Sequence, residues 1–198
     1  MPRRPGLDRQ AVVDAAVEVV NTGGVDALTI NGLARKLGIQ PPSLYNHVHG
    51  LSGLYRELSL RNATLLYECL SRSAIGKSGA EGVAALAGAY RVYIKANPGL
   101  YMASLQASGN RKDADVELGM AERRVVEVCL AVLASFGLVG EDGLHAVRGL
   151  RSLVHGFATL EMAGGFGLPL DCDESFRRMV AMFVRGLTPQ GQVSPPPR

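Results

Sequence analysis

The sequence lacks the features that identify a membrane protein or a disulfide-stabilised secreted protein. It has no tryptophan, and its only three cysteines, Cys69, Cys129 and Cys172, lie far apart. An odd number of dispersed cysteines is typical of free thiols in a reducing compartment. No stretch approaches the roughly 18 uninterrupted apolar residues of a transmembrane helix, and no apolar run follows the arginines of MPRRPGLD as a signal peptide requires. We therefore expect a cytoplasmic protein without a membrane partner.

Charge is also modest. The net charge is +3, and charged residues make up 20% of the chain. Such a balance permits an acidic partner such as nucleic acid without requiring one. Hydrophobic residues make up 47%, which supplies a substantial core and argues against a disordered chain. A chain of 198 residues fits one domain or two small ones.

Motifs for catalysis or metal binding are missing from the sequence. No cysteines and histidines have the spacing of zinc ligands, and no glycine-rich phosphate loop or nucleophile elbow is present. His47 and His49 form an H-x-H, but side chains two apart on a helix point to different sides. His155 and Glu161 could form a dyad, yet the sequence near them offers no nucleophile. We expect no enzymatic activity, no metal and no cofactor.

Helical periodicity, by contrast, runs through nearly the whole chain. Apolar residues recur at spacings of three and four, and no segment shows the period of two that a half-buried strand needs. The expected helices cover residues 8–20, 29–38, 41–49, 52 into the seventies, 80–97, 98–108, 113–136, 141–163 and 173–187. In the seventh of these the pattern places Val116, Met120, Val126, Cys129, Leu133 and Phe136 inward. The sequence predicts an all-α protein of about nine helices.

The segment LTINGLARKLGIQPPSLYNHV, residues 28–48, predicts a helix-turn-helix. Gly38 supplies a left-handed corner between two helices, and the prolines after it fit the first turn of the second helix. Leu44 and Val48, four residues apart, face inward and leave polar side chains on the opposite side. The major groove of B-DNA admits one helix, and Asn, Gln, Ser and His can hydrogen-bond the base edges there. A helical hairpin with a solvated outer face is the alternative for this pattern.

The residue string itself resembles the DNA-binding domain of the TetR family of transcriptional regulators. The resemblance covers about the first 65 residues, through the motifs LT, LA-x-x-LG and LYNHV and the preceding AVVDAAVEVVNTGGVDAL. It implies phosphate contacts by Thr29 and Tyr45. It also implies groove-facing positions at Asn31, Gln40, Pro41, Pro42, Ser43, Asn46 and His47. Arg3 and Arg4 either add backbone or minor-groove contacts or form a solvated tail.

Two features depart from the family pattern. Leu51 stands where the family usually has a lysine, and the predicted recognition helix has no arginine. Ser52, His49 or the N-terminal dipole of the next helix could replace the missing phosphate contact. Residues 1–62 hold seven Lys/Arg against five Asp/Glu, so the DNA-binding part is only weakly basic. A helical ligand-binding or scaffold dimer without DNA affinity is the alternative hypothesis.

The resemblance further implies that the rest of the chain is a helical domain that binds a ligand and dimerises. LRSLVHGFATLEMAGGFGLPLDCDESFRRMV is similar to the C-terminal segment of one TetR subgroup, whose members carry a His-Gly pair here. The last two long helices are apolar on one face and partly on a second, and the small residues Gly156, Ala158, Ala163 and Gly164 would allow close approach. Two such helices per protomer predict a homodimer through a four-helix interface. The core of a monomer is the alternative.

Aromatic and methionine side chains with a few polar groups suit a small, mostly apolar ligand, which the sequence does not identify. The candidate lining residues are Tyr90, Tyr93, Tyr101, Met102, Leu105, Met120, Cys129, His155 and Thr159. Each of them is alternatively an ordinary core residue. His155, four residues before Thr159 on one helix face, is the best polar anchor, although a satisfied buried histidine is more common.

These observations predict three parts in the chain. Residues 5–65 form a TetR-type helix-turn-helix domain, residues 66–188 a helical ligand-binding and dimerisation domain, and residues 189–198 a disordered tail. The resemblance implies a role in transcription regulation. The expected protein is a homodimeric repressor that binds a palindromic DNA operator and is released by a small molecule.

Overall fold

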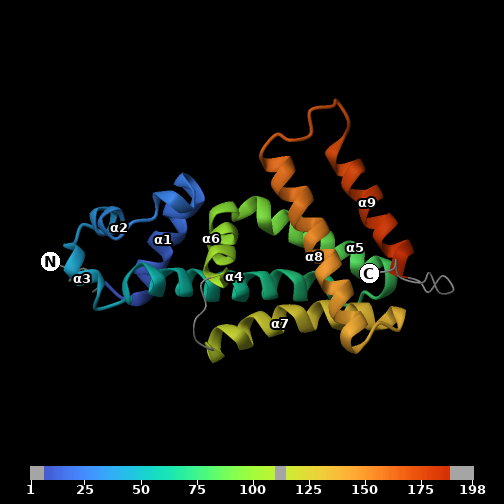
Figure 1. The fold of residues 1–198 in the computed structure, drawn as a ribbon, viewed down its shortest axis with the longest axis horizontal. Helices are drawn as coiled ribbons and strands as arrows, with labels where there is room; N and C mark the ends of the chain where they lie inside the picture. The colour runs from blue at the N-terminus through green and yellow to red at the C-terminus, as the bar shows by residue number, and fades with distance from the viewer. Residues whose placement is uncertain (1–6, 110–114, 188–198) are drawn as a thin grey trace, which may run out of the picture. The chain divides into compact units, whose positions relative to one another are not determined.

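The computed structural model describes residues 7–109 and 115–187, and these residues form helices joined by short turns (Figure 1). The α-helices of this part are α1 (Arg9–Gly23), α2 (Ile30–Leu37), α3 (Pro41–Leu44), α4 (Gly50–Ala74), α5 (Gly79–Ala96), α6 (Pro98–Gly109), α7 (Val116–Leu133), α8 (Gly140–Met162) and α9 (Cys172–Leu187). Two 3₁₀ turns, η1 (Val25–Ala27) and η2 (Ala134–Phe136), complete it. The prediction of an all-α chain with about nine helices is confirmed. None of the helices in the described residues combines the length and apolar character needed to cross a bilayer.

The helices gather into two compact units. Unit 1 contains the described residues up to Leu65 together with those from Ala96 to Arg123, and unit 2 contains Leu66–Lys95 and the described residues from Arg124 onward. Helices α4 and α7 each contribute residues to both units. Residues 96–123 therefore group with the N-terminal helices, although they are distant from them in sequence. The tail predicted for residues 189–198 and the arginines at positions 3 and 4 lie outside the described residues.

Two side chains cap the starts of the first helices, and a glycine ends the second as the sequence predicts. The Asp8 side chain accepts a hydrogen bond from the N–H of Ala11 at 2.8 Å, and that of Thr29 accepts one from Gly32 at 3.0 Å. Both bonds satisfy N–H groups that have no partner within their helix. Gly38 ends α2 with φ of 68°, in the left-handed region that favours glycine.

One apolar cluster fills unit 1. Its members come from α1, α2, α3, α4 and α6 and from the turns before α2 and after α3, and each is less than one-tenth exposed. They are Val12, Val13, Ala15, Ala16, Val20, Leu28, Leu33, Ala34, Leu44, Val48, Leu54, Leu58, Leu100 and Ala103. The last two belong to α6, so this core is not closed by the first four helices alone.

The inward face predicted for the first part of α7 is wrong. Val116 is 71% exposed and Met120 is 63% exposed, whereas Leu118 between them is buried. Residues two apart on a helix lie on nearly opposite sides, so one buried leucine sends both of its neighbours outward. Further along, the burial of Cys129 and Leu133 agrees with the prediction.

In unit 2 the apolar faces of α5, α8 and α9 enclose a charged residue, Arg91. Its guanidinium donates to both carboxylate oxygens of Glu161 at 2.8 and 2.7 Å, and to Asp173 at 2.7 Å. The rings of Phe157 and Phe176 flank it, with centroids 5.3 and 4.8 Å away. Glu161 ends α8 and Asp173 begins α9, so one arginine binds both ends of the connector between these helices.

Candidate nucleic-acid interface

The second helix of the helix-turn-helix is shorter than predicted. Regular helix ends at Leu44, and residues 45–49 continue as turns. The N–H of His47 donates to the carbonyl of Leu44 at 2.9 Å, and that of Asn46 to Ser43 at 3.4 Å. These bonds span three residues rather than four, which tightens the coil. The prediction of a continuous helix to residue 49 was therefore wrong in extent.

The curled segment still has an inner and an outer side. Leu44 is 0% exposed and Val48 is 4% exposed, so both lie in the core of unit 1 as the pattern predicts. The preceding corner is fixed by the N–H of Ile39, which donates to Ala34 at 3.0 Å across Gly38. The position of the outer side is consequently fixed by the packing of the inner residues and by the hydrogen bond across the corner.

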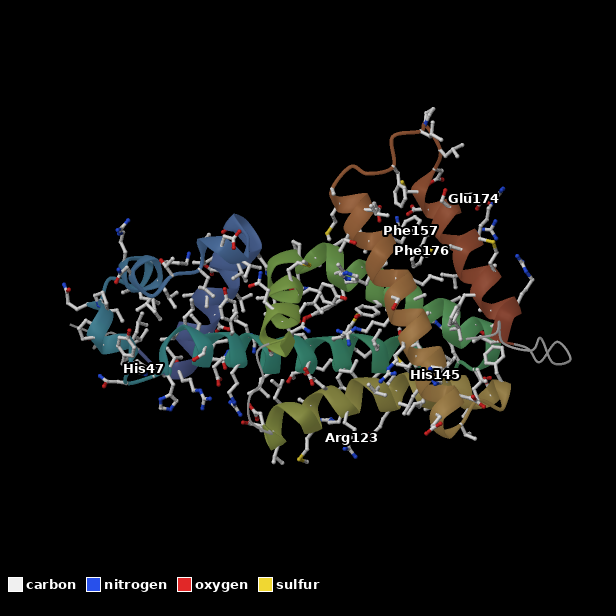
Figure 2. The ribbon with its side chains drawn as sticks, in the orientation of Figure 1. His47, Arg123, His145, Phe157, Glu174 and Phe176 are labelled. Atoms are coloured by element: carbon white, nitrogen blue, oxygen red, sulfur yellow. The ribbon has the colours of Figure 1, made fainter. Side chains whose placement is uncertain are left out.

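All nine residues assigned to DNA contact remain accessible in the structure. Thr29, Asn31, Gln40, Pro42, Tyr45 and Asn46 are exposed, and Pro41, Ser43 and His47 are half-buried. Tyr45 is 58% exposed, which is high for an aromatic side chain in a compact unit. The label in Figure 2 places His47 in the turns that follow α3. Which of these side chains touch DNA stays a prediction.

The side chain of Thr29 caps the start of α2. Its hydroxyl oxygen accepts the N–H of Gly32, so the side chain is held at the helix N-terminus. The hydroxyl hydrogen can still be donated to a phosphate oxygen. The positive end of the helix dipole lies at the same place and favours an anion.

The cations of the helix-turn-helix region are largely neutralised by neighbouring carboxylates. The ion pairs are Arg9–Glu57, Lys36–Glu18, Arg61–Asp14, and Arg56 with Glu57, Asp115 and Glu117. Of the five Lys/Arg in residues 7–65, only Arg35 has no carboxylate partner among the described residues. The described part of unit 1 holds six Lys/Arg against eight Asp/Glu, a net charge of −2. Within the described residues of this region, the groups left to donate to an anion are therefore mainly neutral.

Arg56 lies at the centre of these pairs. It donates to Asp115 at 3.0 Å and to Glu117 at 2.6 Å, which joins α4 to the start of α7. Asp115 also accepts the N–H of Leu118 at 3.1 Å as the cap of α7. The carboxylates raise the pKa of Arg56 above its usual value. An open cavity of about 400 Å³ adjoins the cluster, and it is lined by Arg9, His47, Val48, His49, Gly53, Arg56, Glu57 and Glu117.

The residues proposed to line a ligand site divide between the two units. Tyr90, Tyr93, Cys129, His155 and Thr159 belong to unit 2, and Tyr101, Met102, Leu105 and Met120 belong to unit 1. Each tyrosine and Cys129 is buried, and burial raises the pKa of the Cys129 thiol to about 11. Met102 is 38% exposed and Met120 is 63% exposed, so these two lie at the surface. The Thr159 hydroxyl donates to the backbone of its own helix, to the carbonyl of His155 at 2.8 Å.

Comparison with known proteins gives consistent matches along the chain. The family described as "Bacterial regulatory proteins, tetR family" matches residues 12–49, and that described as "Tetracyclin repressor-like, C-terminal domain" matches residues 83–183. A Bacillus subtilis HTH-type transcriptional regulator is 34% identical over 94% of this chain and 96% of its own. One from Mycobacterium tuberculosis is 37% identical over 91% and 82%. The crystal structure of a possible TetR family transcriptional regulator from Streptomyces coelicolor A3(2) has a TM-score of 0.71 at 19% identity, over 91% and 98%.

Proposed function

The chain belongs to the TetR family of DNA-binding transcriptional regulators, and we propose that it is a homodimeric repressor released from a palindromic operator by a small, mostly apolar molecule. Regulators of this family are not enzymes. Residues 5–65 are the DNA-binding part in this proposal, and residues 66–188 bind the ligand and the second protomer. Because a bound repressor occupies its operator, it excludes other proteins from that DNA.

The observation that carries DNA binding is the two-sided segment 41–48. Its inner residues, Leu44 and Val48, are buried, and its outer side presents Ser43, Asn46 and His47 as hydrogen-bonding groups. Because its inner residues are packed in the core, this segment loses little conformational entropy when it enters a groove of DNA. Base edges in the major groove supply matching donors and acceptors.

The outer faces of α8 and α9 support dimerisation. Leu144 and Leu160 on α8 are 44% and 51% exposed, and Met182 on α9 is 58% exposed. A side chain at Gly156 would meet no atom within 4 Å, so this position leaves room for a neighbouring helix. Two protomers would place two DNA-binding parts roughly 34–36 Å apart, one turn of B-DNA. A ligand releases such a dimer from DNA only if it binds two conformations unequally, and these conformations must differ in the spacing of the DNA-binding parts.

The net charge of −2 on the described part of unit 1 favours one alternative, a helical ligand-binding or scaffold dimer without DNA affinity. A fluorescence-anisotropy titration with the DNA upstream of the protein's own gene separates the two functions. The proposed repressor binds that DNA more tightly than a scrambled duplex at low salt. The absence of binding at low salt would establish the alternative.

Substitution of a residue on the outer side of segment 41–48 tests whether that side contacts the operator. We expect Asn46→Ala to weaken operator binding by about 1–3 kcal/mol, the usual effect of losing a base contact. Gln106→Ala, at an exposed position on α6, is the matched control and should bind as the wild type does. Equal affinity of both variants and the wild type would remove Asn46 from the interface.

The salt dependence of binding tests the charge distribution. Each phosphate neutralised contributes about −0.9 to the slope of log K against log salt concentration. Since Arg35 is the one unpaired cation per protomer among residues 7–65, the dimer of the Arg3→Ala/Arg4→Ala variant should give a slope of about −2. A slope near −6 would mean that the ion pairs open on DNA.

A further inference from the structure

The end of α1 and the first turn of α6 approach each other at backbone distance. A Cβ atom at Gly99 would lie 2.6 Å from the backbone nitrogen of Asn21 and closer still to the carbonyl of Val20. Real Cβ atoms do not come within 3.0 Å of such atoms. Glycine is therefore required at this position if the two helices are to pack as they do.

A hydrogen bond between the same two helices fixes their register. The N–H of Leu100 donates to the side-chain oxygen of Asn21 at 2.9 Å. This N–H lies in the first turn of α6 and has no acceptor within its helix, so a residue of α1 caps α6. Leu100 and Ala103 are both 0% exposed and belong to the core of unit 1. We refer to Val20, Asn21, Gly99, Leu100 and Ala103 as the α6 dock.

The α6 dock includes the carbonyl group that ends α1, just before the chain turns toward the residues expected to bind DNA. The carbonyl of Val20, which Gly99 approaches, accepts the N–H of Gly24 at 3.0 Å and so ends α1. Gly24 has φ of 79° and leads directly into η1. The next bond, from the N–H of Leu28 to the carbonyl of Val25 at 3.1 Å, closes η1, and Thr29 follows. Helix α6 also packs against η1 itself.

We propose that the α6 dock is a positioning element for DNA binding. Helix α6 holds the corner formed by α1 and η1, and this corner places Thr29 and the N-terminus of α2 against a DNA phosphate. This inference rests on the proposed function, because it concerns the affinity for the operator.

A double-mutant cycle tests the proposal without a ligand. Asn21→Ala removes the cap of α6, and Thr29→Ala removes the proposed phosphate contact together with the cap of α2. If the dock acts by placing Thr29, Asn21→Ala lowers operator affinity about tenfold in the wild-type background and less than about twofold when Thr29 is already alanine. Such coupling is not expected of a substitution that only lowers stability.

Ser59→Ala is the matched control. Ser59 is a neutral, buried residue of unit 1 whose hydroxyl donates to the carbonyl of Tyr55 at 3.0 Å, within its own helix. Both variants are compared at a temperature where circular dichroism shows them folded. We expect Ser59→Ala to leave the affinity within about twofold of the wild type and its effect to add to that of Thr29→Ala.

Three outcomes overturn the inference. Wild-type affinity in folded Asn21→Ala contradicts the dock, and so does an equal loss with and without Thr29. If the wild type itself fails to bind, the proposed function and the inference both fall, whereas normal wild-type binding limits the failure to the dock. Gly99→Ala should weaken binding more than Asn21→Ala, and the Asn21 cycle remains decisive if Gly99→Ala does not fold.

Discussion

Arg56 in unit 1 and Arg91 in unit 2 each bind two or more carboxylates from distant parts of the chain, but in different surroundings. The side chain of Arg91 is 10% exposed and that of Glu161 is 14% exposed. The side chain of Arg56 is 31% exposed, and its partner Glu117 is 69% exposed. Water and salt screen the second cluster far more than the first. We therefore expect the same pair of functional groups to contribute more to stability in unit 2 than in unit 1.

The largest effect is expected from Arg91→Met. This variant leaves Glu161 mostly buried without its main partner, and losing one member of a buried pair typically lowers the free energy of unfolding by about 3–5 kcal/mol. Urea denaturation followed by circular dichroism measures the loss. Arg177→Met, which breaks only the exposed pair with Glu174, is the control, with less than about 1 kcal/mol expected. Similar losses in both variants would mean that burial does not distinguish them.

Glu161→Gln should have the next largest effect, and its effect should depend on pH. The hydrogen bonds from Arg91, more than those from Lys95, lower the pKa of Glu161 to about 2. A carboxyl whose pKa is lowered on folding stabilises the protein fully above its unfolded value and loses that contribution as the pH falls toward 2. The wild type should therefore lose its advantage over Glu161→Gln between roughly pH 4.5 and pH 2. A difference in stability that stays constant across this window would contradict the assignment.

Arg56→Ala should destabilise the protein less, by about 1–2 kcal/mol after allowance for its exposure. The loss should shrink in 1 M NaCl, because salt screens partly exposed charges. The loss in Arg91→Met should change little under the same conditions. Thermal unfolding of both variants at low and high salt makes the comparison, and equal salt responses would refute it.

Glu117→Gln should have the smallest effect, less than about 0.5 kcal/mol in unfolding free energy. Glu117 is the most exposed carboxylate on Arg56, and Asp115 and Glu57 remain to hold the guanidinium. Differential scanning calorimetry against the wild type is sensitive enough to detect it. A loss as large as that of Arg56→Ala would show that Glu117 holds the cluster together.

Local signals in the sequence predicted the helices and the corner at Gly38. Asp8, Thr29 and Gly38 act through neighbours within four residues, so their effects can be deduced from spacing alone. The end of α3 could not be deduced in this way, because residues 45–47 form bonds over three residues where a helix was expected. The face of α7 was misassigned because Val116 and Met120 fit the apolar period, while Leu118 took the inward position.

Contacts between residues distant in the chain could not be predicted from the sequence. Arg91 lies at a helical spacing from buried Ala87 and Ile94, which marks it as unusual, but its partners are 70 and 82 residues away. Gly99 follows a proline and could be taken for a turn residue. Only the backbone of Val20 shows why no other residue fits there. The outer residues of segment 41–48 were placed from the motif, and their contacts with DNA are still to be measured.

The presence of Leu100 and Ala103 in the core of unit 1 affects how the protein can be divided for engineering. A fragment cut after residue 65 would carry the whole helix-turn-helix and yet leave an unfilled apolar hollow beside Val20. Chimeric regulators that exchange only this fragment inherit a mismatch with the α6 of the host. A graft that also carries residues 98–103 preserves both halves of the fit.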